Sequence, residues 1–76
     1  MQYIVTTRDT DGSDKRVYKN AKNAIARFEE MLGHSLDNAI AEQYHMNDVA
    51  PKFEDISFVR GVSNFGCVVT LKKVEA

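Results

Sequence analysis

The segment "RDTDGSDKR" (residues 8–16) concentrates the side chains that are most able to bind a cation. Asp9, Asp11 and Asp14 supply hard oxygen ligands, which Ca²⁺ prefers. An EF-hand loop also needs a later glycine and a distal bidentate Glu, but Gly12 comes one residue early and no Glu follows at the required distance. A phosphate-binding loop would open a helix, whereas this segment leads into a strand-like run. We therefore predict a plain hairpin turn in which Gly12 takes the positive φ of a tight turn.

The softer metal ligands and the single thiol show no spacing typical of a site. His34 and His45 would lie about 16 Å apart on one continuous helix, too far to share an ion. Cys67 stands in the apolar run "FGCVVT", where cysteine behaves as a small hydrophobic core residue. Zinc sites normally contain closely spaced ligand pairs, and none is present. We therefore expect no metal, no cofactor and no enzymatic activity.

Basic residues gather beside a tyrosine near residue 17. A set that could bind nucleic acid, with the aromatic ring stacking on a base, is Lys15, Arg16, Tyr18 and Lys19. The pI of about 6.1 opposes this interpretation, because a dedicated nucleic-acid-binding domain is usually strongly basic. The alternative is a solvated strand face, since basic side chains also protect sheet edges from pairing.

Acidic residues dominate the middle of the chain. Residues 29–55 hold seven acidic residues and one basic residue, whereas residues 1–28 hold six basic and three acidic residues. This polarity favours steering toward a protein partner over tight binding to a polyanion. We predict an acidic surface that imitates nucleic acid toward a basic groove of the partner, formed by Glu29, Glu30, Asp37 and Glu42.

Two strands and two helices are predicted for the first part of the chain. The runs "QYIVTT" (2–7) and "KRVYK" (15–19) are rich in strand-forming residues on either side of the turn. A helix begins after the N-cap residue Asn20 and ends at Gly33. A second helix begins at Ser35, and its inner stripe is predicted to be Leu36, Ala39, Ile40 and either Gln43 or Tyr44.

Two further strands are predicted near the C-terminus, at residues 53–61 and 66–74. Strands segregated from helices are typical of an α+β fold. The expected fold is therefore a four-stranded antiparallel sheet with element order β-β-α-α-β-β and the helical segment packed on one face. Phe65 falls in the turn of the last hairpin. We expect it to fold back onto the core, and the alternative is a contact anchor for a partner.

Size and composition indicate a single globular domain over residues 1–76. The chain is 43% hydrophobic and 28% charged, which is ordinary for a globular protein. Its apolar runs are too short to cross a membrane, and its first residues do not resemble a secretory signal. A single cysteine suits a reducing compartment. We therefore expect a cytoplasmic protein.

The stretch "VYKNAKNAIARFEEMLGHSLDNAIAE" resembles the small orphan proteins of tailed bacteriophages. The resemblance lies in a short hairpin start, a "K-A-K-x-A-x-x-x-F-E-E" helix and a closing hairpin. Many such proteins bind a host protein, and some inhibit host defence, as anti-CRISPR proteins do. The resemblance carries over no functional residue, because these proteins share no catalytic signature.

Three functional hypotheses follow. The first is a non-enzymatic, phage-type inhibitor that binds a host protein or nucleoprotein complex in the host cytoplasm. The second is a weak nucleic-acid-binding accessory protein that uses the basic second strand. The third is a homodimeric structural module joined through exposed sheet edges.

Overall fold

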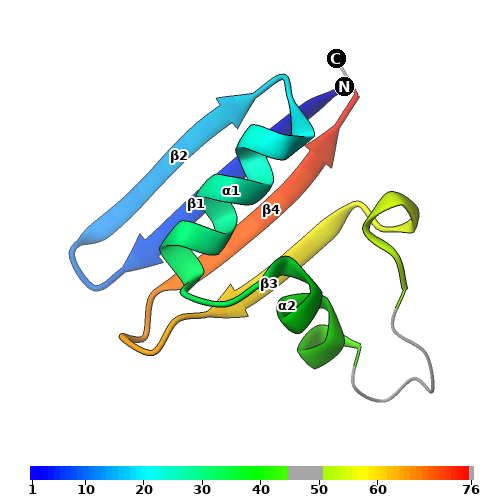
Figure 1. Ribbon diagram of the computed structural model, residues 1–76. Helices are drawn as coiled ribbons and strands as arrows, with labels where there is room; N and C mark the ends of the chain where they lie inside the picture. The colour runs from blue at the N-terminus through cyan, green and yellow to red at the C-terminus, as the bar shows by residue number, and fades with distance from the viewer. Residues whose placement is uncertain (45–50, 76) are drawn as a thin grey trace.

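The computed structural model describes residues 1–44 and 51–75, and its four strands form one antiparallel sheet in the order β2-β1-β4-β3 (Figure 1). The elements are β1 (Gln2–Asp9), β2 (Gly12–Tyr18), α1 (Ala21–Leu32), α2 (Leu36–Gln43), the 3₁₀ helix η1 (Phe53–Asp55), β3 (Phe58–Val62) and β4 (Val68–Val74). The predicted α+β fold and its β-β-α-α-β-β order are confirmed.

The hairpin predicted around residues 8–16 joins β1 to β2 through Thr10 and Asp11. The Asp9 carboxylate accepts a hydrogen bond of 2.9 Å from the Asp11 amide, and Gly12 has a φ of 144°. Local hydrogen bonding and a residue without a Cβ therefore account for the turn. Asp9 and Asp11 lie at the turn, whereas Asp14 lies within β2.

Both helices begin after the predicted N-cap residues, and α1 ends at the predicted Gly33. The Asn20 side chain accepts from the Lys22 amide, and the Ser35 side chain accepts from the Asn38 amide. Gly33, with a φ of 81°, ends α1 in the left-handed conformation. The predicted break between the helices is confirmed, and it lets α2 turn away from α1 toward β3 (Figure 1).

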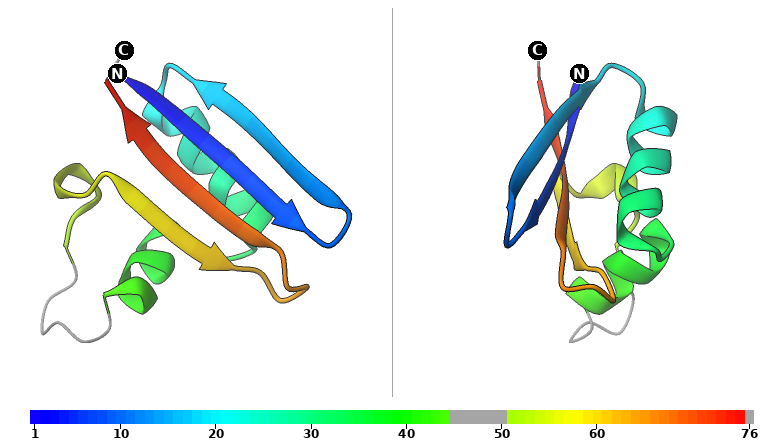
Figure 2. Two further views of the ribbon diagram at one scale, coloured as in Figure 1. Left: turned by 180° about the vertical axis from the view of Figure 1, so that it is seen from behind. Right: turned by 90° about the vertical axis from the view of Figure 1, so that its left-hand side faces the viewer.

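Both helices pack on the same face of the sheet, and none of the described elements covers the opposite face (Figure 2). The core lies between the two layers, where Ala24, Phe28 and Leu32 of α1 meet the sheet residues Val5, Val59, Val69 and Leu71. Leu36, Ala39 and Ile40 complete it from α2. Cys67, predicted as a core residue, is half-buried against this core.

The strand predicted for residues 53–61 is wrong at its start, because residues 53–55 form η1 and β3 begins at Phe58. The Phe53 ring stacks against Tyr3, with centroids 6.5 Å apart, and the Lys73 ammonium lies 4.0 Å from its centroid. Contacts with β1 and β4 therefore draw Phe53 out of the strand. Neither of the described helices has the length and apolar character needed to cross a membrane.

Candidate functional site

Side chains from all four strands meet on the side of the sheet that no described element covers, and we call this surface the open face. It is formed by the even-numbered residues of β1, β3 and β4 and the odd-numbered residues of β2, as the strand register dictates. The core residues Val5, Val59 and Leu71 have the opposite parity and point to the helices. Successive side chains along each strand therefore point alternately to the open face and to the core.

Each strand contributes one basic side chain to the open face. These residues are exposed, and they are Arg8 of β1, Lys15 of β2, Arg60 of β3 and Lys72 of β4. No acidic residue occupies an open-face position within these strands, all of which the structure describes. The open face therefore carries four positive charges although the whole chain has a net charge of −1.

The register places uncharged hydroxyl groups between these cations. Lys15 pairs with Thr6, Thr6 with Thr70, and Thr70 with Arg60, so these four residues form one row across the sheet. Neighbouring strands lie about 4.8 Å apart, which makes the row about 14 Å long. The neighbouring row on one side of this row contains Arg8, which pairs with Val68. The neighbouring row on the other side contains Lys72, which pairs with Ile4. The four basic residues therefore surround the threonine pair.

Phe58 adds an exposed aromatic ring to the β3 end of the open face. It pairs with Lys72, and its side chain is 41% exposed. A shallow hollow of about 480 Å³ is lined by Thr6, Arg8, Phe58, Arg60, Val68 and Thr70. A planar ring, two guanidinium groups and two hydroxyl groups therefore share one concave patch.

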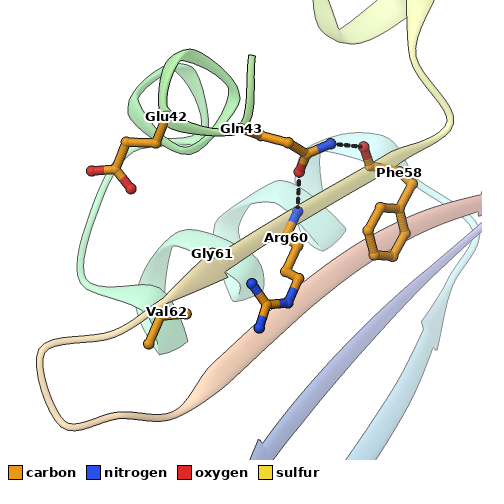
Figure 3. A pocket seen from close by; sticks show the side chains of 6 residues that line it. All are labelled: Glu42, Gln43, Phe58, Arg60, Gly61 and Val62. Atoms are coloured by element: carbon orange, nitrogen blue, oxygen red, sulfur yellow. Dashed lines mark hydrogen bonds between the residues drawn. The ribbon is translucent and has the colours of Figure 1, made fainter. Parts of the chain in front are cut away.

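Gln43, at the C-terminal end of α2, holds the β3 backbone beneath these side chains (Figure 3). Its Nε2 donates to the Phe58 carbonyl oxygen at 3.2 Å, and its Oε1 accepts from the Arg60 amide at 2.6 Å. These are the hydrogen bonds that a neighbouring strand would make. A single side chain thus completes this part of the β3 edge and restrains the backbone between Phe58 and Arg60.

The basic set predicted from the sequence does not stay together. Lys15 lies on the open face, whereas Arg16 points to the helix side and its Nε lies 3.3 Å from Asp14, which also contacts Arg27 of α1. Tyr18 is half-buried against the core. Lys19 is exposed just after β2 ends. Of the predicted set, only Lys15 lies on the open face.

The predicted acidic residues are placed on both helices. Glu29 is half-buried, and its carboxylate accepts the Leu36 amide at 2.7 Å. Glu30 is exposed on α1, and Asp37 is exposed in the first turn of α2. Glu42 lines a hollow beside β3 together with Gln43 (Figure 3). Glu29 therefore has a structural contact, whereas whether the set binds a partner stays a prediction.

Phe65 lies at the tip of the β3–β4 hairpin and is 99% exposed, so the expectation that it packs on the core is wrong. The turn beneath it is well held, because the Ser63 hydroxyl accepts from the amides of Phe65 and Cys67. In a short turn of this kind, the Phe65 ring cannot reach the core between the sheet and the helices. The contact-anchor alternative remains a hypothesis.

Sequence reasoning missed Arg8, Phe58, Arg60 and Lys72 as members of one surface. They come from three strands at opposite ends of the chain, and only the register brings them together. Strand alternation was the one available signal, since it separates Lys15 from Arg16.

No protein-family model, curated protein or solved structure matches this chain in the comparisons. Within residues 1–44 and 51–75, no three His, Cys, Asp or Glu side chains are grouped as a metal site would need. His45 lies outside the described residues.

Proposed function

We propose that this protein is a non-enzymatic binding module that covers a surface of a macromolecular partner with its open face. The observation that carries the proposal is a sheet face that no described element covers, on which four basic side chains surround a threonine pair and two of them, Arg8 and Arg60, line a hollow. Sheets with one free face usually present a polar, solvated surface there. A surface with charges of only one sign is better suited to a partner of the opposite sign.

The partner class implied by the phage-protein resemblance, a host protein or nucleoprotein complex, stays part of this proposal. Phe65 supports a second contact, because an exposed aromatic ring on a restrained turn can enter a pocket with little loss of conformational freedom. The Phe65 tip and the open face are both available in the free protein.

The experiment is capture of partners from bacterial lysate by the tagged protein and three variants. The open-face variant is R8Q/K15Q/R60Q/K72Q, and its charge-matched control is R16Q/K19Q/K22Q/K52Q, which changes four exposed basic residues outside the open face. The acidic variant is E30Q/D37N/E42Q. We expect the open-face variant alone to lose the captured partner. Equal capture by the open-face variant and its control would contradict the proposal.

A further inference from the structure

We propose that the occupant of the open face is a single-stranded nucleic acid, with its phosphates on the four basic residues and one base stacked on Phe58. This inference rests on the proposed function, because it names the partner of the same face. Its first support is the sign of the charges. Within the described strands, the open face holds four basic and no acidic side chains. Surfaces that bind nucleic acid are strongly positive.

The second support is the spacing of polar groups. The row from Lys15 to Arg60 crosses about 14 Å with two threonine hydroxyl groups between the cations. Arg8 and Lys72 extend the positive surface by one row on either side, about 7 Å along the strands. An extended polyanion lying across the sheet would therefore meet a cation at several successive phosphates. Threonine hydroxyl groups donate to phosphate and sugar oxygens in such complexes.

The third support is the exposed ring of Phe58 beside Arg60. Every base has a face that stacks on an aromatic side chain or a guanidinium plane, and both groups line the same hollow. The faces of stacked bases are inaccessible in a duplex but accessible in a single strand. Gln43 restrains the backbone of both residues, so the stacking position exists before the ligand arrives.

The test is fluorescence anisotropy with a fluorescein-labelled single-stranded 12-nucleotide oligothymidylate, titrated at several salt concentrations. Four neutralised phosphates give a slope of log affinity against log salt of about −3. K15Q is expected to reduce the magnitude of this slope by about 0.7, because one phosphate contact is lost. R16Q is the matched control: it removes the same charge from the neighbouring residue on the opposite face and is expected to leave the slope unchanged.

The stacking position is tested by F58A, which is expected to weaken binding by about 5- to 150-fold. F58W should retain the affinity, and V17A, which shortens another exposed apolar side chain of the open face, should change it little. Circular dichroism of each variant checks that the fold is kept.

Two comparison probes separate this inference from the proposed function. A 12-base-pair duplex should bind more weakly than the single strand, and poly-glutamate should bind weakly and without sensitivity to F58A. No binding of the oligonucleotide would overturn the nucleic-acid occupant. Tighter binding of poly-glutamate than of the oligonucleotide would also overturn it and would point to an acidic protein. The proposed function itself fails only when the open-face variant captures its partner as well as its charge-matched control does.

Discussion

Glu29 connects the two helices, because its carboxylate on α1 accepts the first amide hydrogen of α2 at Leu36. The residue was predicted as part of an acidic binding surface, and the neighbouring Glu30 is exposed without this contact to α2. A carboxylate that accepts from the N-terminus of a helix satisfies an amide left without an intrahelical partner. At the residue scale, Glu29 therefore stabilises the start of α2, whereas Glu30 is an exposed surface residue.

We expect E29A to lower the free energy of unfolding by about 1 kcal/mol, the usual cost of losing a helix cap. E30A should change it by no more than about 0.5 kcal/mol, as is usual for a surface substitution. Urea unfolding followed by circular dichroism measures both values. Equal effects of the two substitutions would show that the contact between Glu29 and Leu36 contributes nothing.

Gly61 of β3 is buried against Leu32 of α1. A Cβ at this position would lie 2.8 Å from Leu32 Cδ1, and Leu32 is almost fully buried, so the leucine has no room to move away. We expect G61A to destabilise the protein by about 1–3 kcal/mol through overpacking. In an L32A background the same substitution should cost less, because the leucine methyl groups are gone. A double-mutant cycle measured by urea unfolding tests this, and additive effects would contradict it.

The two edges of the sheet differ at the scale of elements. At the β3 edge, the Gln43 amide group bonds with the backbone groups of Phe58 and Arg60 that a fifth strand would use. At the β2 edge, the residues from Gly12 to Val17 are exposed. Unpaired edges invite pairing with another chain, so the homodimer hypothesis concerns β2 and not this part of β3.

We expect Q43A to increase the hydrogen-exchange rate of the Arg60 amide and to cost about 1 kcal/mol of stability, because the amide loses its acceptor. The Val59 amide is the internal control, since the alternation of an antiparallel pair directs it toward β4. Exchange measured by NMR reads both amides in one sample. Unchanged exchange at Arg60 would show that Gln43 does not close the edge.

Local signals were sufficient to predict most elements. Asn20, Gly33 and Ser35 mark helix ends through short-range hydrogen bonds and backbone conformation, so their positions in the sequence decide the helix bounds. The start of β3 was not predictable in the same way, because Phe53 is held by Tyr3 and Lys73, which are distant in sequence. Contacts of that kind depend on the strand order.

The open face could be predicted only in part. Period-two alternation in the second strand already places Lys15 and Arg16 on opposite faces, and this signal argues against their use as one cluster. The association of Lys15 with Arg60 and Lys72 requires the order β2-β1-β4-β3, which brings both ends of the chain into one sheet. Short-range patterns contain no information on that order.

At the scale of the whole molecule, the protein is a slab of 36 × 31 × 15 Å with one layer of helices and one of strands. Its overall pI of about 6.1 and its net charge of −1 oppose attraction to polyanions. The four described strands nevertheless place four basic and no acidic side chains on the open face. The electrostatic potential near the open face, rather than the net charge of the chain, therefore steers a ligand that approaches this face.

The most direct test is a ¹⁵N-correlation NMR titration of the intact protein with the single-stranded 12-nucleotide oligothymidylate. We predict that the amide shifts at low salt are concentrated in the four strands, with the largest changes around Thr6, Phe58, Arg60 and Thr70, and that they disappear as salt is raised. Shifts concentrated on α1 and α2 around Glu30 and Asp37, or the absence of shifts, would contradict the assignment of the open face as the nucleic-acid surface.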